Sequence, residues 1–210
     1  MAVDVRLLEE VVAVTTGTGA ARAALSLGRF QPDADVDRAA CGALGVDVVR
    51  RPTGGRALLH GGDLTYAVAL PRPAGRAGTV AAVYELVAGA LRAGLARLGV
   101  DARIASNDGP FGPVCFAGRQ GSDLRVGDRK LCGSAQVHRD GGVLQHGSIL
   151  LRRLAFDETA LVRDGGSEAS KRLRASTVTL EELGVPHDAR VVADGVIAGF
   201  ARCLRVAWLR

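Results

Sequence analysis

Three separate stretches of the chain combine small residues with a polar or charged group: residues 50–60, 130–136 and 145–148. Small residues on neighbouring strands leave room for a slender ligand against bare backbone, whose N–H groups can hold a carbonyl oxygen. The first stretch adds arginines and the second adds a lysine. Gly54 and Gly55 alone are equally typical of a charged turn. The three stretches together favour a site for a carbonyl compound.

The chain has four cysteines: Cys41, Cys115, Cys132 and Cys203. They form no C-x-x-C pair and have no metal-ligand spacing with the histidines, so neither a disulfide framework nor structural zinc is expected. Cys115 lies among the two prolines and three glycines of residues 109–118, a loop-like setting in which a cysteine does not simply fill a core. It is therefore a candidate thiolate nucleophile. Cys132 is the rival, but its place in an alternating strand favours packing.

The elements that must position these groups are visible in the hydrophobic pattern. Residues 79–98 predict a helix with Thr79 as N-cap and Gly99 after its end. Residues 64–70 alternate as a strand that ends at Pro71. An antiparallel meander follows, with a type II′ turn at Gly127 and Asp128 and a second turn at residues 140–142. Its strands are predicted at residues 124–126, 130–136 and 143–151.

Residues 179–182 predict a capping box and residues 189–204 a helix. This order indicates an α/β domain of the α+β kind, a mixed, largely antiparallel sheet covered by helices on its outer face. Residues 17–22 imitate the start of a dinucleotide fingerprint. Arg22 stands where its third small residue belongs and no βαβ unit flanks it, so nucleotide binding through this motif is disfavoured.

The composition of the chain limits which classes of protein it can belong to. The chain has 210 residues, of which 48% are hydrophobic, enough for one domain with a real core. Its formal charge of +5 is dispersed, and no basic run with interleaved aromatics suggests nucleic-acid binding. No signal peptide is recognisable, and no apolar run reaches the roughly 18 residues of a membrane span. We expect a cytoplasmic protein with neither nucleic acid nor membrane as partner.

Several motifs, in order, resemble those of the biotin/lipoate A/B protein ligase family: VRRPTGGRALLH (49–60), LTY (64–66), CF (115–116), RKLCGSAQ (129–136) and LQHGSIL (144–150). The stretch ALSLGRFQ (24–31) also matches the strand that precedes them. Within the family the motifs look most like those of cysteine-dependent octanoyltransferases of lipoate biosynthesis. The resemblance spans residues 24–151 and implies a biotin/lipoate protein ligase-like catalytic domain.

The resemblance implies transfer of octanoate from acyl carrier protein, through a thioester on Cys115, to the lipoyl-domain lysine of an acceptor such as the glycine-cleavage H protein. It matches Lys130 to the motif lysine. A nearby ammonium lowers a thiol pKa and steadies an oxyanion, and thioester exchange needs no ATP, so no cofactor is expected. The residues implied to line the acyl pocket are Arg51, Gly54, Gly55, Arg56, His60, Gly133, Ser134, Ala135, His146, Gly147 and Ser148. His138 and His187 are expected at the surface.

The chain also departs from the family pattern. Only 23 residues precede Ala24, so residues 1–210 are interpreted as a single acyltransferase/ligase-like domain with a shortened N-terminal region. Three functions remain open: the octanoyltransferase, an ATP- and Mg-dependent lipoate or octanoate ligase, and a non-catalytic acyl-binding relative. Arg56 stands where ligases of the family have a third glycine, which favours the transferase. The acyl-chain length is not specified by the sequence.

Overall fold

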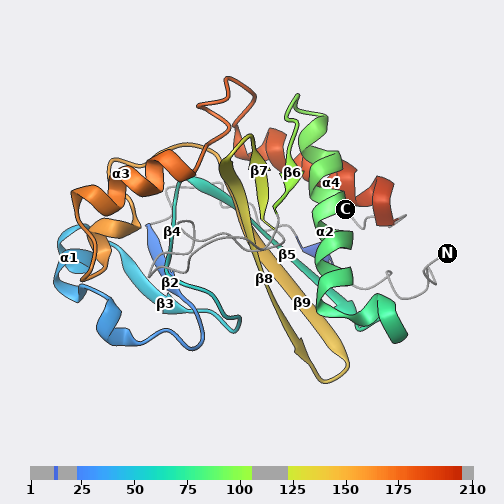
Figure 1. Ribbon diagram of the computed structural model, residues 1–210, viewed down its shortest axis with the longest axis horizontal. Coiled ribbons are helices and arrows are strands. Elements are labelled where there is room, and N and C mark those ends of the chain that lie inside the picture. Colours follow the sequence, from blue (N-terminus) through green and yellow to red (C-terminus); the bar gives the residue numbers. More distant parts are fainter. Residues whose placement is uncertain (1–11, 14–22, 106–122, 205–210) are drawn as a thin grey trace.

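The computed structural model describes residues 12–13, 23–105 and 123–204 (Figure 1). Its helices are α1 (Arg38–Ala43), α2 (Val80–Ala96), α3 (Ser167–Ser176) and α4 (Ala189–Leu204). Its strands are β1 (Val12–Ala13), β2 (Ala24–Leu27), β3 (Asp47–Arg50), β4 (Leu58–His60), β5 (Asp63–Pro71), β6 (Arg103–Ile104), β7 (Leu124–Val126), β8 (Arg129–Arg139) and β9 (Gly142–Leu150). None of the described helices is long and apolar enough to cross a membrane.

The larger sheet is antiparallel, with the strand order β1-β5-β9-β8-β7-β6. Helices α2 and α4 pack against each other and cover one face of it (Figure 1). Alternate residues of β5 point to that face, and the apolar stripes of both helices meet them in one core. The predicted helix at 79–98 is confirmed as α2, capped by the Thr79 side chain, which accepts from the Ala82 N–H.

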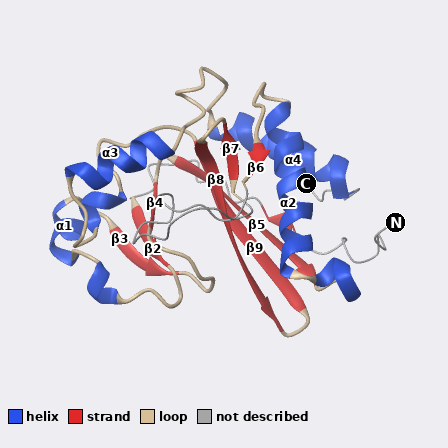
Figure 2. Ribbon diagram, viewed as in Figure 1, coloured by secondary structure: helices blue, strands red, loops and turns tan. Residues whose placement is uncertain are grey.

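A second, three-stranded sheet has the order β3-β2-β4, with β2 parallel to β3 and antiparallel to β4 (Figure 2). It builds its own core with α1 and with the segment leading to α3. The sequence pattern had predicted one sheet, and this part of the prediction was wrong. β3 and β4 were not predicted because each contains two adjacent apolar residues, Val48 and Val49 in one and Leu58 and Leu59 in the other, and so neither alternates.

Two tight turns connect the strands of the meander. Gly127 has φ +56° at the first turn position between β7 and β8, as the predicted type II′ turn requires. Asp140 and Gly141 both have positive φ, which defines a type I′ turn between β8 and β9. The capping box is confirmed, because Thr179 and Glu182 exchange two hydrogen bonds, but it closes a turn and not an α-helix.

Candidate active site

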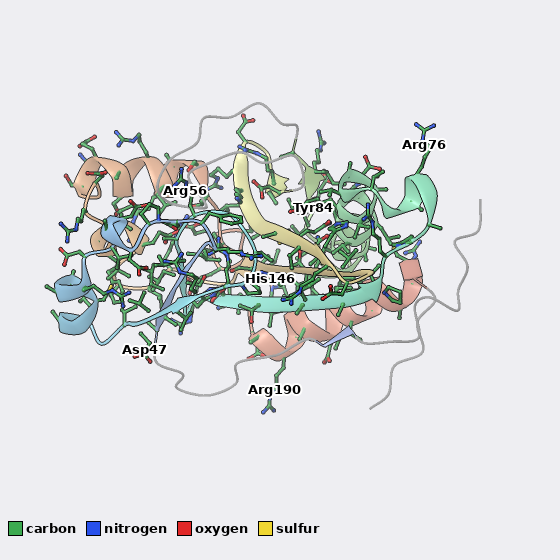
Figure 3. All side chains as sticks on the ribbon, turned by 90° about the horizontal axis from the view of Figure 1, so that it is seen from below. Asp47, Arg56, Arg76, Tyr84, His146 and Arg190 are labelled. Atoms are coloured by element: carbon green, nitrogen blue, oxygen red, sulfur yellow. The ribbon has the colours of Figure 1, made fainter. Side chains whose placement is uncertain are left out.

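The face of the larger sheet that the helices leave uncovered carries small residues. Cross-strand rows place Thr65, Ser148 and Gly133 side by side, and Ala67, His146 and Ala135 in the next row. Residues in one row share a face, and side chains this small leave the backbone accessible to a neighbour. Figure 3 places His146 near the middle of the molecule, with Arg56 toward the smaller sheet and Tyr84 toward the helices. We call this surface the small-residue face.

Two of the expected pocket residues, Ser134 and Gly147, lie on the opposite, helix-covered face. The Ser134 hydroxyl is 2.6 Å from the hydroxyl of Tyr66, and a Cβ on Gly147 would stand 2.5 Å from the Tyr66 ring. Burial raises the pKa of Tyr66 above its ordinary range, so the phenol stays protonated. The Ser134 hydroxyl and the absence of a side chain at Gly147 therefore serve the packing of Tyr66.

Lys130 is aimed by a bulge at the start of β8. Leu124 pairs with Cys132 while Arg125 pairs with Lys130, so β8 advances two residues where β7 advances one. Leu131 and Cys132 both enter the helix-side core as a result. Strict alternation would have put Lys130 beside Cys132. The extra residue instead lets Lys130 turn away from that core and meet Asp123.

Asp123 and Lys130 form a buried ion pair. The Lys130 Nζ lies 2.9 Å from the Asp123 Oδ2, and the two side chains are 3% and 2% exposed. Lysine and aspartate are almost never this deeply buried unless they are paired, because transfer of a lone charge from water is very unfavourable. A cation held at a fixed place in low dielectric is what an active site uses to stabilise developing negative charge.

The cysteines separate by environment. Cys115 lies outside the described residues. Cys132 is completely buried, and burial together with the Asp123 charge raises the pKa of its thiol to about 12. A thiol with such a pKa holds almost no thiolate at neutral pH, so Cys132 is a packing residue, as predicted. Cys203 is exposed on α4, and burial raises the pKa of Cys41 in α1.

The glycine loop, residues 51–56, is held from inside by Arg51. Its guanidinium donates to the carbonyls of Ser26, Gly54 and Arg56 at 2.8, 3.1 and 2.6 Å. Gly28 is required beside the loop, since a Cβ there would stand 1.9 Å from the Gly55 carbonyl oxygen. Gly55 has φ +95°, which only glycine adopts readily. The loop conformation is thus set by local packing and by one arginine.

A polar relay connects this loop to the larger sheet. Asp63 Oδ2 lies 2.8 Å from His60 Nδ1, and His60 Nε2 lies 2.8 Å from the Ser26 hydroxyl, which also accepts from Arg51 at 3.2 Å. Ser148 donates to the same Asp63 oxygen. The order imitates a Ser-His-Asp triad. Ser26 is only 4% exposed and is occupied by Arg51, however, so the relay positions the loop.

Asp63 is ionised within the relay. Burial raises its pKa, but hydrogen bonds and charge from His60, with further hydrogen bonds from Ser148 and the Gly61 N–H, outweigh burial and hold the pKa below its ordinary value of 3.8. The carboxylate therefore keeps a proton on His60 Nδ1, which leaves Nε2 to face Ser26. Of the expected pocket residues, Arg51, His60 and Ser148 are thereby bound to protein partners.

Asp63→Asn is expected to lower the free energy of unfolding at pH 7 by about 1–3 kcal/mol, since it removes a charged acceptor of several hydrogen bonds. Because the folded pKa is depressed, this contribution is complete above pH 3.8 and is lost as pH falls through the lower folded value. Urea unfolding at pH 7 and pH 3 should show the gap between wild type and variant narrowing. Asp47→Asn, at an exposed position, is the control. An equal gap at both pH values would contradict the assignment.

His146 is neutral on the small-residue face. Burial, followed by the charges of Arg51 and His60, lowers the pKa of His146 to about 4. Its Nε2 lies 2.6 Å from the hydroxyl of Thr53, a buried residue of the glycine loop. This contact brings the loop against the small-residue face. Of the other histidines, His138 is partly exposed beside Gln136, and His187 is exposed.

A groove of about 480 Å³ opens further along the same sheet, lined by Pro52, Ala69, Val137, Leu144 and neighbouring residues. Val137 is seven residues from Lys130 along β8, roughly 23 Å at the rise of an extended strand. An extended octanoyl chain is less than half as long. An acyl group whose carbonyl meets Lys130 therefore does not reach this groove.

Residues 4–201 match the family described as the lipoyl protein ligase A/B catalytic domain. The match covers nearly the whole chain, and it agrees with the site, in which the motif lysine and the glycine loop flank a face of small residues. The chain belongs to this family. The resemblance inferred from the motifs is confirmed.

Curated relatives include the octanoyltransferase LipM of Symbiobacterium thermophilum, 42% identical over 199 residues, which cover 86% of this chain and 71% of the relative. The octanoyltransferase LipM of Carboxydothermus hydrogenoformans is 34% identical over 230 residues, covering 100% and 83%. Solved structures include a lipoate protein ligase from T. acidophilum with bound lipoic acid, with a TM-score of 0.72 at 23% identity over 90% of this chain and 71% of that one. At this identity the structure confirms the fold alone.

The residues of the site that the sequence analysis missed include Ser26, Asp63 and Asp123. Ser26 and Asp63 belong to short strands or strand ends, where one polar residue carries no periodic signal. Asp123 lies in the segment immediately before the meander. A lysine in a buried strand needs a carboxylate to balance its charge, and this requirement could have pointed to Asp123.

Proposed function

We propose that the protein is a cytoplasmic octanoyltransferase that takes an octanoyl group from acyl carrier protein onto Cys115 and passes it to the lipoyl-domain lysine of an acceptor such as the H protein. The octanoyltransferase class is confirmed by curated relatives at 34–42% identity. The donor, the cysteine step and the compartment belong to the proposal. The observation that supports it most is the buried Lys130 cation beside the small-residue face.

In the first half-reaction the Cys115 thiolate attacks the thioester carbonyl carbon, and collapse of the tetrahedral intermediate expels the thiolate of the carrier. In the second, the acceptor amine attacks the acyl-cysteine, the C–N bond forms, the C–S bond breaks, and the amine loses a proton. Both steps place negative charge on the carbonyl oxygen. We assign to Lys130 the task of stabilising that negative charge. One fixed donor of this kind accelerates a reaction by about 10²–10³-fold.

The acyl chain would lie on the small-residue face, over Gly133 and Thr65, beside the glycine loop. Small side chains leave a trough for methylene groups and give few polar contacts that a chain would have to displace. The proposal includes no ATP and no metal ion, because each half-reaction exchanges or consumes a thioester. Arg51 and His60 shape the loop in this scheme and need not touch the acyl group.

The test is incubation of the protein with octanoyl acyl carrier protein and apo H protein without ATP, followed by intact mass measurement. An adduct of octanoyl mass is expected, and Cys115→Ser should abolish it. Cys203→Ser, which changes another cysteine at an exposed position, should retain it. Transfer that requires ATP and free octanoate and survives Cys115→Ser would overturn the proposal in favour of a ligase.

A further inference from the structure

We propose that Asp123 is a positioning residue that keeps Lys130 positively charged and aims its ammonium group at the reacting carbonyl. The inference rests on the proposed acyl transfer, to which it adds the partner that makes a buried lysine usable as a cation. It assigns Lys130 the task of a fixed charge.

The first argument is burial. Desolvation of a lysine disfavours its ammonium form, and in a fully buried site it can make the neutral amine the stable form near neutral pH. Lys130 is 3% exposed, so solvent does little for its charge. The carboxylate of Asp123 at 2.9 Å supplies the missing stabilisation. Loss of this carboxylate would favour the neutral form of the lysine side chain.

The second argument is the rigidity of both backbones. The Lys130 carbonyl accepts from the Val178 N–H at 2.9 Å, and the Asp123 carbonyl accepts from the Ala105 N–H at 2.8 Å. The bulge between β7 and β8 fixes their relative register. The ion pair thus joins two anchored segments, and its geometry is defined before any substrate binds. A preorganised charge needs no rearrangement during the reaction.

The third argument is the charge of the surroundings. Across the ladder from Lys130 stands Arg125 of β7, and Arg153 reaches Thr177, whose strand-like segment bridges to Lys130. Both are cations, and they disfavour a further positive charge nearby. Glu182 is bound to Arg153, and Cys132 is held as a neutral thiol. Asp123 is a carboxylate in direct contact with Lys130.

The scarcity of lysine makes the protonation state measurable. Lys130 and Lys171 are the only lysines among 27 basic residues, so protein labelled with ¹³C-lysine gives two side-chain signals. Lys171 is exposed on α3 and serves as an internal control. In the wild type, the Lys130 signal at pH 7 is expected to be that of an ammonium group, as the ion pair with Asp123 requires. In Asp123→Asn the signal of the neutral amine should increase for Lys130 and not for Lys171.

Catalysis provides the second readout. The alkaline limb of the pH profile for acyl-enzyme formation should move to lower pH in Asp123→Asn and return in Asp123→Glu, which restores the negative charge. A loss of structure alone would lower the rate without moving the limb. Should Asp123→Asn fail to fold, the wild-type titration decides, because a neutral Lys130 at pH 7 overturns the inference.

The two proposals fail separately. If the wild type forms no acyl-enzyme but the Lys130 titration depends on Asp123, acyl transfer is refuted and the electrostatic role of Asp123 stands. If acyl transfer proceeds and Asp123→Asn changes neither the titration nor the pH profile, the role of Asp123 is refuted. Lys130 would then be held in its charged state by other means.

Discussion

Lys130→Met is expected to slow acyl-enzyme formation by about 10²–10³-fold and to lower the free energy of unfolding by about 3–5 kcal/mol. The first effect follows from the loss of the cation that we assign to the carbonyl oxygen. The second follows because the Asp123 carboxylate, 2% exposed, is left buried without its ion-pair partner. A mass-resolved time course with octanoyl acyl carrier protein measures the rate, and urea unfolding measures the stability.

Two controls separate these effects. Lys171→Met removes the other lysine, which is exposed and paired with Glu168, and should change neither quantity appreciably. The double variant Lys130→Met, Asp123→Asn removes both buried charges and should recover most of the lost stability while the rate stays low. A single variant that acylates at the wild-type rate would remove Lys130 from the mechanism.

Gly147→Ala is expected to lower the free energy of unfolding by about 3 kcal/mol or more, the upper range for overpacking a core. The new Cβ would stand 2.4 Å from the Gly133 carbonyl oxygen and 2.5 Å from the ring of Tyr66. Neither can yield easily, because Gly133 lies in the central strand β8 and Tyr66 is 1% exposed. Thermal or urea unfolding would measure the change.

The matched control is Gly89→Ala. Gly89 lies in α2, and a Cβ there meets nothing within 4 Å. That substitution should stabilise the helix by roughly 0.5–1 kcal/mol, because alanine loses less backbone entropy than glycine. Equal behaviour of the two variants would mean that Gly147 is not needed for the packing of Tyr66.

Much of the fold was predictable because its central elements are long. The pattern of residues 79–98 spans five turns of helix, and β5 alternates over nine residues, so each carries a strong periodic signal. The smaller sheet was not predictable, since β3 and β4 are held by contacts with β2 and not by patterns of their own. The bulge in β8 was also not predicted, although the adjacent apolar residues Leu131 and Cys132 interrupt the alternation there.

The residue types of the candidate site were predictable, but the contacts between these residues were not. The sequence singled out Lys130 and the glycine loop as candidates, since glycine and lysine are unusual where strands are otherwise apolar. It could not show that Ser134 and Gly147 face the helices, because a strand's alternation does not say which face binds ligand. Nor could it show that Arg51 and His60 bind each other through Ser26, a contact between residues 25 and 34 positions away.

The relay of Asp63, His60, Ser26 and Arg51 has a consequence for redesign of the enzyme. The glycine loop cannot be exchanged as a cassette, because the arginine that holds it is itself held by residues of three different strands. A loop transplanted from a relative with another substrate would need the matching residues at positions 26, 60 and 63. Libraries that vary the glycine loop alone would mostly yield loops that the relay cannot hold in place. Libraries that vary positions 26, 51, 60 and 63 together with the loop would yield pocket shapes that the scaffold can support.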